Sequence, residues 1–283
     1  MEAEYKKGNA GRFAPGLPAK GDGQMLFLLN GVAKLKDDGQ MAIIQNGSSL
    51  FTGDAGSGQS EIRRYLIEND WLDVIVQLPT NAFYNTPITT YIWIVTKNKD
   101  PHRRGKVQLI DGSACGMSRR KNIGSKNTDI SQNCRDLVVK AYGEFRDGSF
   151  EGEDENGAKI LVKSKVIDAI DFGYNKITVE SPELDENGKP VLKKGKPVAD
   201  TSKRDTENVP LAEDIDAYFR REVIPYNPDA WIDKTKTKVG YEIPFTRTFY
   251  EYKQIEPSDM IAKRIEAHEK SLMAKLHDLF GEE

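Results

Sequence analysis

The sequence LDVIVQL at residues 72–78 and the sequence TTYIWIVT at residues 89–96 decide the fold of this chain. Both are short apolar runs rich in β-branched residues, which indicates buried strands. A shorter apolar run at 41–44 precedes them, and residues 61–69 carry apolar side chains at helical spacing. The order strand, helix, strand predicts a right-handed crossover in a largely parallel sheet. The strand at 89–96 follows the previous one directly, which predicts an antiparallel edge.

Further elements lie on both sides of this unit. The apolar spacing predicts helices over 24–35, 129–145 and 213–223, and strands over 106–110 and 176–180. Residues 182–206 are polar and contain Asn187-Gly188, which predicts an extended hairpin or a mobile loop. From Ser258 onward, apolar residues recur every three or four positions, which predicts an amphipathic helix of about six turns at 3.6 residues each.

Together these elements predict an α/β fold. We expect the C-terminal portion of a Rossmann-like sheet with mixed parallel and antiparallel strands, followed by a mostly helical C-terminal region. Three parts are expected. Residues 1–112 would form the back half of the sheet domain, and residues 113–256 an irregular α+β extension with the mobile loop 182–206. Residues 257–283 would form the C-terminal amphipathic helix.

Composition excludes several classes of protein. The chain has 283 residues and a net charge of -3, so overall charge predicts neither a nucleic-acid nor a membrane partner, and any basic surface must be local. No apolar run reaches the roughly 18 residues of a membrane span, so we expect a cytoplasmic protein. Cys115 and Cys134, with three His residues, do not match the spacing of metal ligands. We expect reduced thiols and no metal site.

A Gly-rich stretch at 53–60 lies between a predicted strand and a predicted helix. Such a position can bind phosphate, because glycine lets backbone N–H groups approach and the helix N-terminus favours anions. However, no Lys follows Gly58, and the stretch lacks the spacing of a dinucleotide-binding loop. A flexible surface loop is therefore the favoured interpretation, with nucleotide binding as the weaker alternative.

Two other segments are candidates for DNA contact. Phe83 and Tyr84 follow a predicted strand and could stack on a base, although such pairs more often serve in packing. The segment 102–126 holds seven basic residues against one acid, which suits either phosphate contact or a solvated loop. The candidates for contact with the DNA backbone are Arg103, Arg104, Arg119, Arg120 and Lys121. No spacing indicates a catalytic triad or a carboxylate pair, so no catalytic residue is assigned.

Several stretches, in order along the chain, resemble the modification subunit of type I restriction-modification systems, a family of N6-adenine DNA methyltransferases. They are LFL (26–28), DGQMAII (38–44), SLFTGDAGSG (49–58), EIRR (61–64), IENDWL (67–72), the run 74–97, DFGY (171–174), KITVE (176–180) and IPFTR (243–247). The resemblance covers the C-terminal half of that subunit. It implies that the predicted sheet is the end of a methyltransferase sheet and that Phe83 or Tyr84 lies beside the target adenine.

The resemblance also implies what this chain lacks. The family uses S-adenosylmethionine, bound by a Gly-containing loop, and holds adenine with an Asn-Pro-Pro motif. Neither occurs here, since Asn227-Pro228 is followed by Asp229. The stretch GRF at 11–13 resembles the segment just after that motif in the family, so we expect Met1 to lie just past it, as in a truncated reading frame, a split gene or a shortened piece. We therefore expect a methyltransferase fragment that binds no cofactor and is inactive alone.

The resemblance implies three partners: a specificity subunit, DNA, and, indirectly, a restriction subunit. The residues expected to dock the specificity subunit are Ile265, Leu272, Leu276 and Leu279 on the C-terminal helix. The same helix could instead fold back on its own domain. The alternative function, from another class, is a non-enzymatic assembly or DNA-binding module that docks a specificity subunit. The DNA recognition sequence is set elsewhere in this family.

Overall fold

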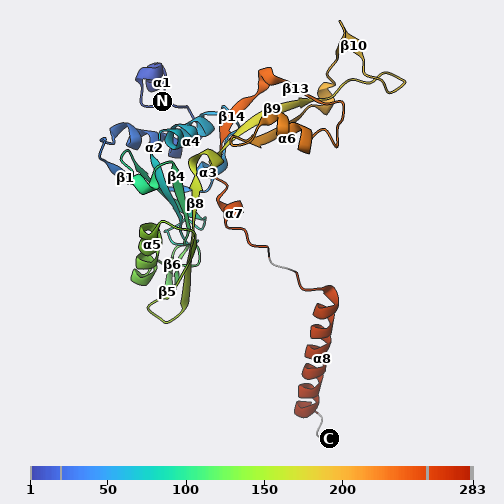
Figure 1. The fold of residues 1–283 in the computed structure, drawn as a ribbon. Helices are drawn as coiled ribbons and strands as arrows, with labels where there is room; N and C mark the ends of the chain where they lie inside the picture. The colour runs from blue at the N-terminus through green and yellow to red at the C-terminus, as the bar shows by residue number, and fades with distance from the viewer. Residues whose placement is uncertain (1, 20, 253–254, 281–283) are drawn as a thin grey trace. The chain divides into compact units, whose positions relative to one another are not determined.

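The computed structural model describes residues 2–19, 21–252 and 255–280 and divides the chain into two units, 1–248 and 249–283. A six-stranded sheet in the first unit has the strand order β1-β3-β2-β4-β8-β7. Figure 1 labels β1, β4 and β8 of this sheet. Its strands are β1 (Gln40–Asn46), β2 (Leu72–Gln77), β3 (Thr90–Thr96), β4 (Lys106–Asp111), β7 (Gly148–Glu153) and β8 (Lys159–Asp168). The fold is thus α/β with a mixed sheet, as predicted.

The pairing of these strands corrects two expectations. Only β2 and β4 pair in parallel, and the other four pairings are antiparallel, so the sheet is not largely parallel. In addition, β3 does not lie at an edge. It pairs with β1 on one side and β2 on the other, with Tyr91 opposite both Gln45 and Gln77. The helical crossover between β1 and β2 leaves room for β3 between them.

The sheet also continues past the boundary expected at residue 112. Strands β7 and β8 form a hairpin around the Asn156-Gly157 turn, and β8 pairs with β4. The apolar pattern did not predict these two strands, because charged side chains interrupt the apolar ones, as in KILVKSKVID at 159–168. This alternation is typical of a strand with one buried face.

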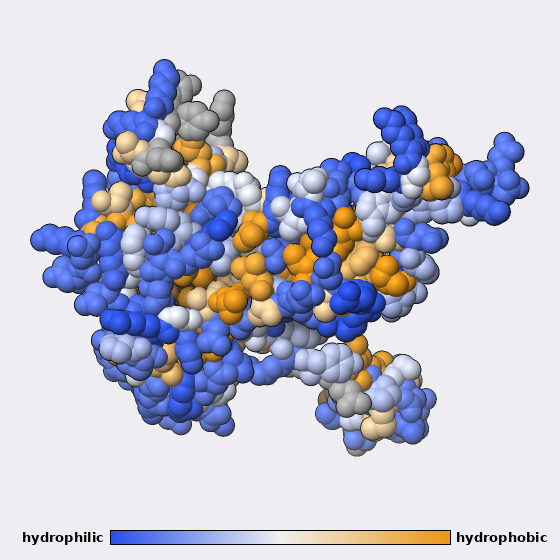
Figure 2. Space-filling model, turned by 45° about the horizontal axis from the view of Figure 1, so that its top comes forward, coloured by the Kyte–Doolittle hydropathy of each residue, from blue (hydrophilic) through white to orange (hydrophobic). Residues whose placement is uncertain are grey.

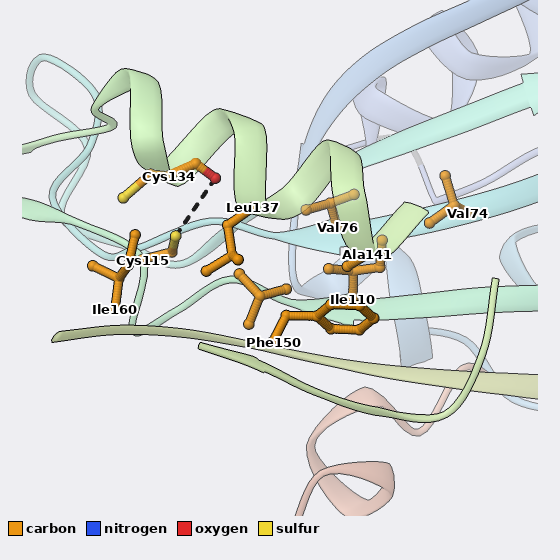
Figure 3. Packing of buried hydrophobic residues seen from close by; sticks show 10 residues of the cluster. Val74, Val76, Ile110, Cys115, Cys134, Leu137, Ala141, Phe150 and Ile160 are labelled. Atoms are coloured by element: carbon orange, nitrogen blue, oxygen red, sulfur yellow. Dashed lines mark hydrogen bonds between the residues drawn. The ribbon is translucent and has the colours of Figure 1, made fainter. Parts of the chain in front are cut away.

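Four described helices accompany the sheet. They are α2 (Gly23–Lys34), α3 (Ser48–Phe51), α4 (Gly58–Glu68) and α5 (Gln132–Glu144). Helix α2 packs on β1. Helix α5 contacts β4, β7 and β8, and its Cys134, Leu137 and Ala141 pack in one buried cluster with residues of these strands and of β2 (Figure 3). In the same cluster the Cys115 thiol lies 3.6 Å from the Cys134 carbonyl oxygen. Both cysteines are free and buried.

A second sheet has β9 (Gly173–Glu180) as its central strand. This strand pairs antiparallel with β12 (Asp205–Pro210), β13 (Trp231–Ile232) and β14 (Lys238–Tyr241). Helix α6 (Ile215–Glu222) packs against it through Phe219. Two hairpins complete the strands: β5 (Met117–Ile123) with β6 (Lys126–Asp129), and β10 (Leu192–Lys193) with β11 (Lys196–Pro197). Ten described strands therefore follow residue 112, which corrects the expectation of a mostly helical C-terminal region.

Buried Arg63 links α4 to the second sheet. Its Nε donates to the Tyr241 carbonyl at 2.6 Å, and its Nη1 donates to the carbonyls of Ser49 and Thr52 at 3.1 and 3.0 Å. In return, the Tyr241 N–H donates to Ser60 Oγ at 2.9 Å. Burial lowers the pKa of Arg63 to about 10. This side chain thus satisfies backbone carbonyls where three segments meet.

The remaining helices are short, apart from α8. They are α1 (Glu2–Tyr5), α7 (Phe245–Thr248) and the 3-10 turns at Gly8–Ala10, Pro101–Arg103, Ala169–Phe172, Thr201–Lys203 and Lys234–Lys236. In the second unit, α8 runs from Ser258 to Phe280 and begins at the predicted residue. On the face of the molecule drawn in Figure 2, hydrophilic side chains predominate and hydrophobic ones gather in separate areas.

Candidate nucleic-acid interface

The loop between β2 and β3, residues 78–89, is held by its own backbone and by the β5–β6 hairpin. Asn81 and Asn85 adopt positive φ values of 55° and 53°, which Asn tolerates better than most residues. The Asn81 carbonyl accepts the N–H groups of Asn127 and Thr128, at 3.2 and 3.3 Å. Two main-chain hydrogen bonds therefore attach the loop to the hairpin, although the segments are more than 40 residues apart in sequence.

Close contacts at two glycines tighten the same attachment. A Cβ added at Gly116 would lie 3.0 Å from the Pro79 ring. A Cβ added at Gly124, where φ is +57°, would lie 2.9 Å from Tyr84 Cε2 and 2.6 Å from Asn85 Oδ1. The turn of the hairpin thus needs a glycine, both for its backbone conformation and for the approach of the Tyr84 ring.

The two aromatic candidates differ in exposure. Phe83 is half-buried and bridges to Thr86 across a tight turn. Tyr84 is 63% exposed, and its ring lies against the tip of the β5–β6 hairpin. Because a base can stack only on an accessible ring face, Tyr84 is the better placed of the two.

The basic residues of the hairpin fall into two groups. Arg119 Nη1 contacts both carboxylate oxygens of Asp129 at 2.6 Å, and Lys126 contacts the same carboxylate at 3.0 Å. These two cations, Arg119 first, hold the pKa of Asp129 below its usual range. Arg120 and Lys121 are exposed and form no ion pair with any other described residue. The hairpin therefore offers two free cations on the strand that leads to the turn beside Tyr84.

Arg103 is corrected as a DNA-backbone candidate. Its guanidinium is buried, its Nε donates to Asp73 Oδ1 at 2.7 Å, and its Nη2 donates to Gln108 Oε1 at 3.0 Å. It also lies over the rings of Tyr142 and Phe145, 4.3 and 4.0 Å from their centroids. A count of basic residues could not reveal this role. The neighbouring Arg104 is exposed and remains a candidate.

The Gly-rich stretch 53–60 is closely packed where it enters α4, so it does not form an open phosphate cradle there. Ser57 caps α4 by accepting the Ser60 N–H at 3.4 Å. A Cβ added at Gly58 would lie 1.8 Å from the Leu17 carbonyl oxygen, so the backbone of residues 16–17 lies directly on the start of the helix. Asp54 forms an ion pair with Lys176 at 2.7 Å. Glycine is needed here for close backbone packing.

Helix α8 presents the residues expected to dock a partner. Ile265, Leu272, Leu276 and Leu279 are all exposed, as are Met273 and Phe280. Within this unit Arg264 pairs with Glu256 at 2.9 Å. An exposed apolar stripe of this length is typical of a helix face that packs against another surface.

No group of three or more His, Cys, Asp or Glu side chains within residues 2–19, 21–252 and 255–280 could hold a metal ion. In the same ranges no helix is both long and apolar enough to cross a membrane.

Comparisons with known proteins point to one family. A family model described as N-6 DNA Methylase matches residues 2–182. The chain is similar to the type I restriction enzyme MjaIX methylase subunit of Methanocaldococcus jannaschii, with 34% identity over 115 residues, or 40% of this chain and 19% of that protein. It is also similar to the HindI methylase subunit of Haemophilus influenzae, with 32% identity over 118 residues, or 42% of this chain and 26% of that protein.

Among solved structures, the type I methyltransferase subunit from Streptococcus thermophilus matches with 26% sequence identity and a TM-score of 0.45. This match covers 56% of the present chain and 30% of that one. The matches to all three relatives therefore cover less than a third of each relative's length.

Proposed function

The chain belongs to the N-6 DNA methylase family, and from this we propose that it forms part of a type I restriction-modification methyltransferase subunit. In this proposal it supplies the rim of the base pocket and a DNA-backbone contact, without the residues that perform methyl transfer. The observation that carries the proposal is the docking of loop 78–89 onto the β5–β6 hairpin. This docking brings exposed Tyr84 next to the turn that follows the free cations Arg120 and Lys121.

The topology supports a place for residues 1–112 at the end of a Rossmann-like methyltransferase sheet. Strands β1 and β2 both run antiparallel to β3, so they are parallel to each other, with α4 between them in sequence. Loop 78–89 begins at the carboxyl end of β2, the edge at which ligands bind in sheets of this type. The loop is therefore at a suitable edge for contact with a flipped base.

The Gly-rich stretch at 53–60 is the part of this chain that most resembles a cofactor loop. There the Leu17 backbone covers the start of α4, so an adenosyl or carboxylate group would compete with it. The described residues do not fit the cofactor at this loop, and the chain has no Asn-Pro-Pro motif. We assign no step of methyl transfer to this chain and propose that it is inactive alone.

Helix α8 supports a second function, assembly. We propose that residues 257–283 dock a specificity subunit through Ile265, Leu272, Leu276 and Leu279, which would connect the chain indirectly to a restriction subunit. The exposed stripe favours this role and fits equally a non-enzymatic module that recruits a specificity subunit. A cytoplasmic location, where the DNA would be, is part of the same proposal.

The base-pocket assignment is tested with the whole chain and a fluorescent duplex that carries one unpaired adenine. Tyr84→Ala removes the exposed ring, and Tyr226→Ala, at another exposed tyrosine, is the matched control. A stacking contact is worth about 1–3 kcal/mol, so Tyr84→Ala should weaken binding roughly 5- to 150-fold. Equal affinities for wild type and Tyr84→Ala would refute the assignment, as would equal losses in both variants.

A further inference from the structure

The segment 181–200 forms a projecting arm between β9 and β12 (Figure 1). Backbone hydrogen bonds order it, among them Glu183 N–H to the Val198 carbonyl and Val191 N–H to the Glu183 carbonyl, both at 2.8 Å. Yet side chains 183–190 and 192–197 are all exposed. The arm therefore has a defined backbone without a core, so its fold buries little apolar surface.

The base of the arm is fixed in place. Glu180, 3% exposed at the end of β9, accepts from Arg204 Nε and Lys236 Nζ, both at 2.8 Å. Next to it, Asn227 Nδ2 donates to Ser181 Oγ at 2.8 Å. These contacts hold Glu180 and Ser181 at the start of the arm and Arg204 after its end, so the arm leaves the second sheet from an anchored base.

The tip of the arm concentrates positive charge. Strands β10 and β11 place Lys193 directly opposite Lys196, and the two-residue turn between them contains Lys194. Like charges directly opposite one another destabilise an antiparallel pair. Within the described residues no carboxylate pairs with these three lysines or with exposed Lys189. The hairpin thus carries a repulsion that an anion would relieve.

The turn between β10 and β11 has a lysine at a position that disfavours it. Lys194 and Gly195 have φ values of 53° and 76°, the conformation of a tight hairpin turn that favours Asn-Gly. A Lys at the first position is strained relative to Asn. The arm's other turn, at Asn187-Gly188, has Asn before Gly. The lysine at the tip is therefore poorly explained by turn formation.

We propose that the β10–β11 hairpin is a second DNA contact, with Lys193, Lys194 and Lys196 on the phosphate backbone of duplex DNA. This inference rests on the proposed function, which supplies DNA as the anion. A two-stranded ribbon has the width to lie in or along the major groove, and phosphate contacts orient a protein without reading sequence. Since the chain has a net charge of -3, the attraction must come from local sites such as this one.

The test measures how the affinity of the whole chain for a labelled duplex depends on salt concentration. Each lost phosphate contact should lower the slope of log affinity against log salt by about 0.9, or up to about 2.7 for K193Q/K194Q/K196Q. The matched control, K34Q/K36Q/K159Q, removes the same charge from exposed lysines elsewhere and should leave the slope unchanged. The variant K193R/K194R/K196R keeps the charge and should restore the wild-type slope.

The outcomes separate this inference from the proposed function. A wild-type slope in K193Q/K194Q/K196Q, with the slope of R120Q/K121Q reduced, would overturn the arm contact alone. An equal fall in slope in the control triple variant would also overturn it, because the effect would then be one of net charge. Absence of any duplex binding by wild type would overturn both.

Discussion

The replacement Arg103→Met tests whether this arginine is structural. The change removes three hydrogen-bond donors, to Asp73, Gln108 and the Tyr142 carbonyl, at 2.7, 3.0 and 3.1 Å. Among the described residues, the buried Asp73 carboxylate then keeps only the Tyr142 hydroxyl as a side-chain hydrogen-bond donor. Breaking a buried ion pair by removing one partner costs about 3–5 kcal/mol in the free energy of unfolding. The Met side chain recovers some packing between the Tyr142 and Phe145 rings, so we expect the lower half of this range.

The assay is thermal unfolding followed by circular dichroism. A loss of 1 kcal/mol lowers the midpoint by about 2–4 °C in a domain of 150–250 residues, so Arg103→Met should lower it by about 6–16 °C. The loss should persist at high salt, because salt screens a buried pair weakly. Exposed Arg104→Met is the control and should change stability by no more than about 0.5 kcal/mol. A midpoint within 2 °C of wild type for Arg103→Met, together with a weaker salt dependence of DNA binding, would show that our correction is wrong.

Three further predictions concern other parts of the chain. Gly58→Ala should lower the free energy of unfolding by about 1–3 kcal/mol, because the added Cβ meets the Leu17 carbonyl. Denaturant titration measures this loss, and unchanged stability would mean that the segment 16–17 does not cover α4. L272D/L276D should abolish capture of a specificity subunit in a pull-down and leave the thermal midpoint within about 2 °C of wild type, since surface changes cost little stability. Unfolding of the variant would instead place α8 in the chain's own core. Burial opposes the ionisation of Glu180, but the hydrogen bonds from Lys236 and Arg204 outweigh it and lower its pKa below the ordinary 4.5. The stability from this group is therefore complete above pH 4.5 and is lost as pH falls through the lowered pKa; Glu180→Gln should flatten the pH dependence of unfolding below pH 4.5, and an unchanged profile would argue against the network.

Sequence periodicity located the helices better than it located the strand order. Helices α2, α4, α5, α6 and α8 begin and end within three residues of the predicted bounds, because an amphipathic period is a local property. The position of β3 between β1 and β2 depends on pairing between distant segments, which no local pattern encodes. Where apolar positions alternate with charged ones, as in β8, the strand resembled a solvated segment.

The candidate site was predictable only in part. The Phe83-Tyr84 pair and the basic segment could be recognised from the sequence. The contact between their loop and hairpin could not, because it is made by the Asn81 carbonyl and the sequence carries no signal for a main-chain acceptor. One signal for Arg103 was present: Asp73 is a lone acid inside an apolar strand and requires a buried cation. The tip of the arm also had a signal, in the order Lys-Lys-Gly-Lys at 193–196.

The most direct test of the central claim is the salt dependence of duplex binding by R120Q/K121Q. If the β5–β6 hairpin contacts DNA beside Tyr84, the loss of two phosphate contacts should lower the slope of log affinity against log salt by about 1.8 relative to wild type. The thermal midpoint should stay unchanged, because both side chains are exposed and form no ion pair with a described residue. A slope equal to that of wild type, in a folded variant, would contradict the account.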